Sequence, residues 1–183
     1  MRSPRVLLLP GWQNSGDGHW QTRWERLHGF ERLQQDDWWW PRRGDWMIRL
    51  EENLLADERP AVLVAHSLGC HLVTAWAAHS QHTTRVVAAL LVAPPDLRRA
   101  AGPPQLQAWA PVHHQPLPFA STAVLSADDP FSPVDRSQVL AAAWGSEIVK
   151  LGPAGHVNGD SGLGDWPEGL ALLRGLLRRA GGA

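Results

Sequence analysis

The sequence predicts an α/β fold: a three-layer sandwich with a mostly parallel central sheet of about six strands. Short apolar runs alternate with longer amphipathic stretches, as in strand–helix–strand units with right-handed crossovers. The apolar runs contain few polar residues, as expected for strands covered on both faces. The chain has 183 residues, of which 44% are hydrophobic, so it can form one buried core. We therefore expect a single domain over residues 1–183.

In the first half of the chain, apolar runs predict strands at Arg5–Pro10 and Pro60–Ala65, with a weaker candidate at Glu31–Gln35. A helix is predicted at His19–Leu27, because its apolar positions are spaced by four and three residues. A second helix is predicted at Asp45–Leu55, because an aspartate is a favourable residue at a helix start.

The second half of the chain continues the alternation. The further predicted elements are, in order, a helix at Leu68–His79, a strand at Arg85–Ala93, a strand at Ala120–Ser126, a helix at Val134–Trp144, a strand at Glu147–Leu151 and a helix at Pro167–Leu177. The last helix starts with proline and is followed by arginines and glycines, which suit a helix end. Pro94–Phe119 is rich in proline and is predicted to be mostly loop, with one short helix.

Bulk properties narrow the possible functions. The net charge is −1, so no basic surplus favours nucleic acid as a partner. A single cysteine, Cys70, excludes an intramolecular disulfide, and the N-terminal apolar run Val6–Leu9 is too short for a signal peptide or a membrane span. We therefore expect a cytoplasmic protein that does not associate with membranes. No metal-binding or nucleotide-binding motif is present, so we expect no metal and no cofactor.

The strongest functional signal is Ala65-His66-Ser67-Leu68-Gly69, between a predicted buried strand and a predicted helix. It matches the nucleophile elbow G-x-S-x-G, with Ala65 in place of the first glycine. In such an elbow a strained turn lifts the serine hydroxyl above the sheet, and the residues two positions before and after it must be small. Ser67 is therefore a candidate nucleophile. The alternative is a serine that only caps the helix.

A serine nucleophile needs a base, and the base needs an acid that orients it; in this arrangement the chain order is serine, acid, base. Gly155-His156 follows the last predicted strand and supplies the candidate base. Asp128 and Asp129 follow the preceding strand, and the residues alone leave the choice between them open, although Pro130 restricts the backbone of Asp129. Each motif by itself also fits an ordinary loop. Three motifs in the right order favour a serine hydrolase.

The backbone around the nucleophile is expected to stabilise an oxyanion. The N–H of Leu68 is one candidate donor, because it opens a helix directly after Ser67. The N–H of Trp12 is the second, because Gly11 permits a close backbone approach after the first strand. Gly11, His19 and Trp20 are the candidate substrate-binding residues. His66 is expected to point away from the attacking face and to pack or form a hydrogen bond.

These motifs resemble the retinoblastoma-binding protein nine family of small serine hydrolases, in particular its bacterial members. The resemblance runs along nearly the whole chain. It is carried by Pro10-Gly11-Trp12, Gly18-His19-Trp20, Val64–Cys70, Ser126–Phe131, Gly155–Asn158 and Ser161–Pro167. It implies a minimal α/β-hydrolase core without a lid domain and a catalytic triad of Ser67, His156 and Asp129. Ala65 departs from the glycine that many hydrolases have.

The sequence thus predicts a hydrolase that cleaves small acyl esters through an acyl-enzyme on Ser67, and an open site that favours short acyl groups. Thioesters and amides remain possible substrates, since the same residues act on them. A non-catalytic binding or regulatory protein on a hydrolase scaffold is the alternative from another class. No motif for a protein partner is matched, and the expected partner is a small acyl substrate.

Overall fold

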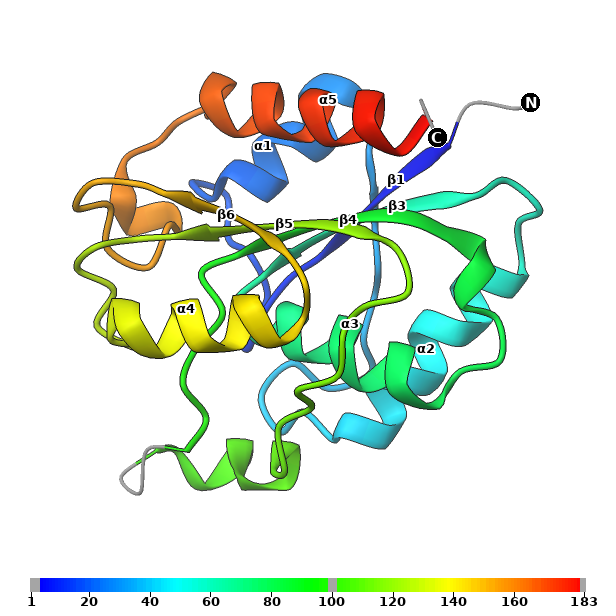
Figure 1. The fold of residues 1–183 in the computed structure, drawn as a ribbon, viewed down its shortest axis with the longest axis horizontal. Helices are drawn as coiled ribbons and strands as arrows, with labels where there is room; N and C mark the ends of the chain where they lie inside the picture. Colours follow the sequence, from blue (N-terminus) through cyan, green and yellow to red (C-terminus); the bar gives the residue numbers. More distant parts are fainter. Residues whose placement is uncertain (1–3, 99–101, 182–183) are drawn as a thin grey trace.

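The computed structural model describes residues 4–98 and 102–181. Six parallel strands form one open sheet with the order β2-β1-β3-β4-β5-β6. Figure 1 shows helices α1 and α5 on one face of this sheet and helices α2, α3 and α4 on the other. The predicted three-layer α/β fold is therefore confirmed, and every strand of the sheet is parallel.

The elements follow the predicted order. The strands are β1 (Arg5–Leu9), β2 (Glu31–Arg32), β3 (Ala61–His66), β4 (Val86–Val92), β5 (Ala120–Leu125) and β6 (Glu147–Lys150). The α-helices are α1 (Trp20–His28), α2 (Arg43–Leu55), α3 (Leu68–His79), α4 (Val134–Ala143) and α5 (Pro167–Gly181). Short 3-10 helices are η1 (Thr83–Arg85), η2 (Pro104–Trp109) and η3 (Gly159–Ser161), and η2 lies in the proline-rich segment.

Both faces of the central strands are buried, which explains their continuous apolar runs. Alternate residues of β1 and β3 pack into two cores, because successive side chains of a strand point to opposite faces. Leu7 and Leu63 lie in the core under α2 and α3, whereas Leu8 and Val64 lie in the core under α1 and α5. The edge strand β6 differs, because its side chains are mostly exposed.

Buried tryptophans hold loops onto these cores. The side chains of Trp20, Trp24, Trp46, Trp109 and Trp144 are almost fully buried, and each indole N–H donates to a backbone carbonyl outside its own helix. A buried indole needs such a partner, because an unpaired buried donor is costly. The tryptophan-rich composition therefore serves the attachment of loops as well as the filling of the core.

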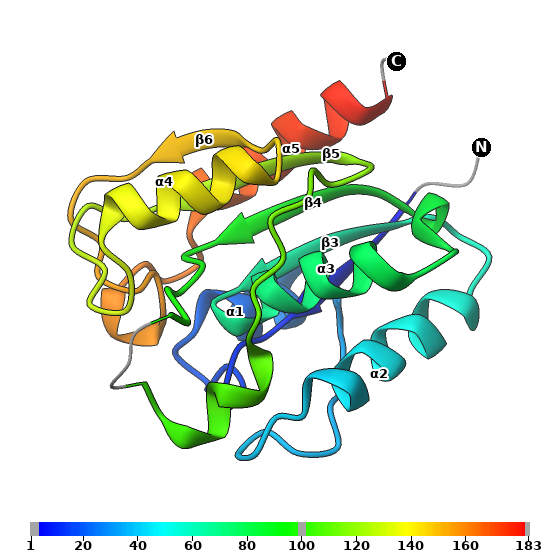
Figure 2. The same cartoon turned by 60° about the horizontal axis from the view of Figure 1, so that its bottom comes forward.

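Parallel strands bring their carboxyl ends to one edge of the sheet. Figure 2 shows the arrowheads of β3, β4 and β6 pointing towards the same end of the molecule. The loops that follow β1, β3, β4, β5 and β6 start at this edge, where ligands of open α/β sheets usually bind. Across residues 4–98 and 102–181, none of the helices combines the length and hydropathy that a membrane crossing requires.

Candidate active site

Ser67 occupies a sharp turn between β3 and α3. Its backbone has φ 54° and ψ −122°, a conformation that residues with a side chain rarely adopt. The turn is held because the N–H of Ser67 donates to the carbonyl of Val92 at 2.9 Å. Two glycines make room for it. A Cβ on Gly11 would lie 2.8 Å from the Cβ of Ser67, and one on Gly69 would collide with the carbonyl of Leu9.

The structure brings Ser67, His156 and Asp129 into one hydrogen-bonded line, although they follow three different strands. The Nε2 of His156 lies 2.8 Å from the Oγ of Ser67. The Nδ1 of the same ring lies 2.9 and 3.0 Å from the two carboxylate oxygens of Asp129. The side chains of His156 and Asp129 are only 9% and 3% exposed, so water competes little with these contacts.

The geometry also fixes the proton positions. An ionised carboxylate only accepts hydrogen bonds, so the proton of a neutral His156 ring resides on Nδ1. The lone pair of Nε2 then faces the hydroxyl of Ser67, which donates to it. This is the arrangement in which a histidine can remove the proton of a serine nucleophile.

Asp128 has a different role from its neighbour. Its Oδ1 accepts hydrogen bonds from the Oγ of Ser126 at 2.9 Å and from the N–H of Gly155 at 2.8 Å. The bond from Gly155, followed by the bond from Ser126, lowers the pKa of Asp128. Asp128 therefore ties the loop after β5 to the residue that precedes His156, and does not contact the imidazole of His156.

Two further histidines, His19 and His66, form a buried hydrogen-bonded chain that leads to His156. The Nδ1 of His19 accepts the N–H of Gln21 at 3.1 Å, which leaves the proton of a neutral His19 on Nε2. This Nε2 lies 3.3 Å from the Nδ1 of His66, and the Nε2 of His66 lies 2.8 Å from the carbonyl of His156. The N–H groups therefore all donate in one direction, and the chain ends on the backbone of His156.

Burial keeps this chain neutral. Desolvation, followed by the charges of Arg32 and His156, lowers the pKa of His19 to about 3. Desolvation also lowers the pKa of His66 well below its ordinary value. His66 thus forms hydrogen bonds to His19 and to the backbone of His156, as expected for a hydrogen-bonding residue, and it also lines the cavity above Ser67.

A cavity of about 570 Å³ opens at the carboxyl edge of the sheet above Ser67. It is lined by Gly11, Trp12, Gln13, Asn14, Gly16, Gly18, His19, His66, Ser67, Leu68, Pro95, Pro103, Leu106, Phe131, His156, Asn158, Gly159 and Asp160. Trp12 and Leu68 both belong to this wall, and their backbone N–H groups are the expected oxyanion donors. Within residues 4–98 and 102–181, neither donates a hydrogen bond to another protein group. Both are therefore available to a substrate oxygen.

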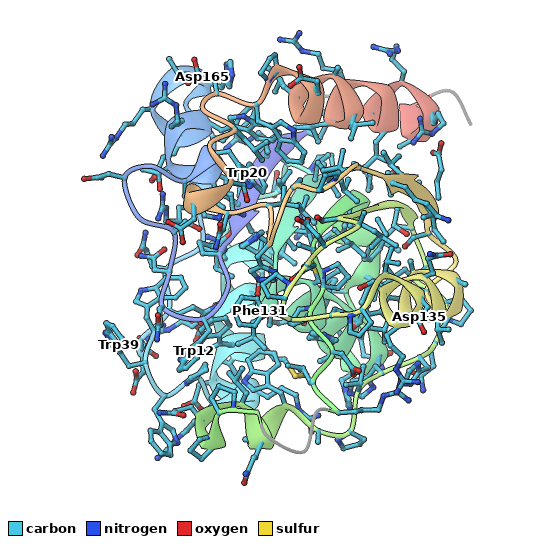
Figure 3. All side chains as sticks on the ribbon, turned by 90° about the vertical axis from the view of Figure 1, so that its left-hand side faces the viewer. Trp12, Trp20, Trp39, Phe131, Asp135 and Asp165 are labelled. Atoms are coloured by element: carbon cyan, nitrogen blue, oxygen red, sulfur yellow. The ribbon has the colours of Figure 1, made fainter. Side chains whose placement is uncertain are left out.

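Trp20 does not reach the cavity, in contrast to the expectation from its sequence position. Its side chain is 1% exposed, and its indole N–H donates to the carbonyl of Val157 at 2.7 Å. In Figure 3, Trp20 lies inside the molecule near α1, away from Trp12 and Phe131. The reason is helical geometry: His19 caps α1 and faces the site, and the next residue turns into the core. His19 and Gly11 do line the cavity.

Sequence reasoning gave no role to several residues of the site. Phe131 packs edge-on against the ring of His156, with centroids 4.6 Å apart. Asn158 caps η3 through its side chain and lines the cavity next to Asp160. Leu106 of η2 also reaches the cavity wall. Phe131 and Asn158 end two of the motifs that carry the family resemblance, but those motifs assign them no role, and no local pattern marks Leu106.

A family model described as serine hydrolase matches residues 6–175, and this range contains Ser67, Asp129 and His156. The chain belongs to the serine hydrolase family. No curated protein matches the chain. A solved YdeN-like hydrolase from Pectobacterium atrosepticum is 28% identical to this serine hydrolase, with a TM-score of 0.87, over 97% of this chain and 92% of that one.

Two other solved structures share the fold of this serine hydrolase. The ydeN gene product of B. subtilis is 22% identical, with a TM-score of 0.75, and the match covers 96% of this chain and all of that one. An esterase from Thermogutta terrifontis is 16% identical, with a TM-score of 0.67, and the match covers 97% of this chain and 90% of that one. The family membership identifies the protein as a hydrolase, and these neighbours share its α/β fold.

Proposed function

We propose that this hydrolase cleaves small acyl esters through an acyl-enzyme on Ser67, with His156 as general base and acid and Asp129 as the orienting carboxylate. The observation that carries the proposal is the unbroken hydrogen-bonded line from Ser67 Oγ through both ring nitrogens of His156 to Asp129. The free N–H groups of Trp12 and Leu68 beside Ser67 support it. The narrower relationship to the retinoblastoma-binding protein nine family is part of the same proposal.

In the first half of the reaction, the Oγ of Ser67 attacks the carbonyl carbon while its proton moves to Nε2 of His156. The electron pair of the carbonyl bond moves onto the oxygen, which accepts hydrogen bonds from the N–H groups of Trp12 and Leu68. When this intermediate collapses, the bond from carbon to the alcohol oxygen breaks. The proton on Nε2 passes to the departing alcohol, and the acyl group remains on Ser67.

Water completes the cycle. His156, again neutral, removes a proton from a water molecule as the water oxygen attacks the acyl carbon. Collapse of the second intermediate returns the proton from Nε2 to Ser67 Oγ and releases the carboxylic acid. Asp129 holds the ring in the required tautomer and stabilises its charged form, and does not take the proton itself.

The lining of the cavity favours substrates with short acyl groups. Its apolar wall comes from Trp12, Leu68, Leu106, Pro95 and Phe131, and the side chain of Phe131 is 51% exposed. A wall that is partly open to water removes only part of a long acyl chain from solvent. We expect turnover of acetyl and butyryl esters to exceed turnover of palmitoyl esters. Thioesters and amides of similar size fit the same machinery.

Labelling with a fluorophosphonate probe tests the proposal. The wild-type protein should be labelled and should hydrolyse p-nitrophenyl butyrate, whereas Ser67→Ala should show no labelling and a loss of about 10³-fold or more. Ser146→Ala is the matched control, because Ser146 lies outside the cavity lining. Unchanged circular dichroism and melting temperature establish that Ser67→Ala is folded. Labelling of a folded Ser67→Ala protein would contradict the assignment.

A further inference from the structure

The cavity above Ser67 has two ends of different chemistry. At one end, Leu68 belongs to the core under α2 and α3, and Trp12 and Leu106 pack against that core. At the other end, the walls come from the loop before α1 and from the segment after His156, which is anchored through Val157 in the core under α1 and α5. Figure 3 shows Trp12 and Phe131 apart from the α1 side of this edge.

The α1 end is polar and spacious. Asn14, Asn158 and Asp160 line the cavity from the loop before α1 and the segment after His156, together with glycines. A Cβ on Gly16 or Gly18 would meet no atom within 4 Å, so open space lies in front of this wall. At the back, a Cβ added to Gly159 would lie 3.6 Å from the backbone of Gly18, so the two segments approach closely at these glycines.

The chemistry of the proposed reaction decides which end holds which part of an ester. The departing alcohol oxygen must receive its proton from Nε2 of His156, so the alcohol lies beside His156 and the segment that follows it. The carbonyl oxygen must face the N–H groups of Trp12 and Leu68. The acyl chain is then directed to the apolar end, next to the side chains of Trp12, Leu68 and Leu106.

Charge distinguishes the alcohol end further. Asp160 is the acidic residue of the lining, and the described lining residues include no lysine or arginine. The carboxylate of Asp160 has no hydrogen-bond or ion-pair partner among residues 4–98 and 102–181, whereas its backbone is held by Asn158. Arg32, which donates to the Oδ1 of the lining residue Asn14, is paired with Glu25, and Arg26 is paired with Asp17. Asp160 therefore adds an unneutralised negative charge to this end.

We propose that the substrates of this enzyme are esters of a short apolar acid with a polar alcohol that is neutral or cationic, and that Asp160 disfavours anionic alcohols and thiols. The inference rests on the proposed ester hydrolysis at Ser67 and adds the identity of the leaving group. It sets acyl thioesters of phosphate-bearing carriers outside the substrate range, because phosphate groups would meet the carboxylate of Asp160 and no lysine or arginine of the lining.

Three butyryl esters of similar size provide the test: butyrylcholine, its uncharged analogue 3,3-dimethylbutyl butyrate, and the anionic 3-(butyryloxy)propanesulfonate. Two unit charges about 7 Å apart in water interact enough to change binding by about threefold. We therefore expect kcat/KM to fall about threefold from the cationic to the neutral ester and again from the neutral to the anionic ester. In Asp160→Asn these ratios should approach one, and 1 M NaCl should weaken them in the wild type.

Asp165→Asn is the matched control, because Asp165 lies on the same segment, is paired with Arg23 and does not line the cavity. It should leave the ratios unchanged. Equal rates on all three esters, or a ratio that survives Asp160→Asn, would overturn the inference while leaving ester hydrolysis intact. Absence of turnover of all three, with no probe labelling of Ser67, would overturn the proposed function as well. Probe labelling without turnover would overturn the assignment of ester substrates.

Discussion

Substitution of His66 can remove either of its two hydrogen bonds separately: the one to His19 or the one to the carbonyl of His156. His66→Asn places an amide oxygen near the former Nδ1 and keeps an acceptor for His19, but loses the donor to His156. His66→Gln places an amide nitrogen near the former Nε2 and keeps the donor to His156, but loses the acceptor for His19. The two variants therefore remove one buried hydrogen bond each, on opposite sides of the ring.

The expected magnitudes follow from these contacts. Each substitution leaves one buried polar group unpaired, so each should lower the free energy of unfolding by about 1–3 kcal/mol. Only His66→Asn releases the backbone of His156, whose ring must stay within hydrogen-bond reach of Ser67. A displacement of about 1 Å in a catalytic group can cost about 10²-fold in rate. We therefore expect kcat to fall about 10–100-fold in His66→Asn and much less in His66→Gln, with KM nearly unchanged in both.

Urea unfolding gives the stability of each variant, and p-nitrophenyl butyrate hydrolysis gives kcat and KM. His71→Asn is a control for burial, because His71 is a buried histidine whose ring bonds to the carbonyl of Pro95 and does not contact His156. It should lose stability with little change in kcat. Equal losses of kcat in His66→Asn and His66→Gln, at equal stability, would refute a positioning role for His66.

Three other predictions follow from the site and the core. Asp129→Asn should lower kcat by about 10⁴-fold, whereas Asp128→Asn, which loosens only the loop, should lower kcat far less. Steady-state kinetics of both variants measure this, and a larger loss in Asp128→Asn than in Asp129→Asn would show that the roles are reversed. Burial lowers the pKa of His71 from 6.5 to about 4, so the unfolded chain binds its proton first as pH falls. Stability from His71 is therefore complete above pH 6.5 and declines towards pH 4, by about 2 kcal/mol at pH 5, and His71→Leu should flatten the urea-measured pH dependence. Trp20→Phe should lower stability by about 1–3 kcal/mol, because the carbonyl of Val157 loses its donor, while the relative rates on acetyl and butyryl esters stay unchanged.

The sequence predicted the elements well where the apolar pattern was continuous. β3 and β4 are buried on both faces, and a continuous apolar run in the sequence predicts a strand of this kind. The strand predicted at Glu147–Leu151 is confirmed as β6, but the expectation of burial on both faces is wrong there, because this edge strand is mostly exposed and carries charged residues at both ends. It also overestimated β2, which pairs over two residues before the chain leaves the sheet.

The candidate site was predictable where chemistry imposes a local pattern. The elbow around Ser67 and the loops of Asp129 and His156 follow directly from strand ends, so their chain order is visible in the sequence. The links from His19 to His66 and from Asp128 to Gly155 join residues that are far apart in sequence. Trp20 was misplaced for a related reason: the direction of a side chain at a helix start depends on packing, which an adjacent motif does not reveal.

The two open edges of the sheet differ in their capacity to recruit further strands from other molecules. An exposed edge offers unpaired N–H and carbonyl groups, which can seed aggregation. The β2 edge offers only two residues, so little backbone is available there. The β6 edge is longer, but Glu147 and Lys150 place opposite charges along it and Arg179 of α5 pairs with Glu147. Ile148 lies between these charges and is 36% exposed. Replacement of Glu147 or Lys150 by an apolar residue would therefore extend the apolar surface of Ile148 along the edge and favour self-association.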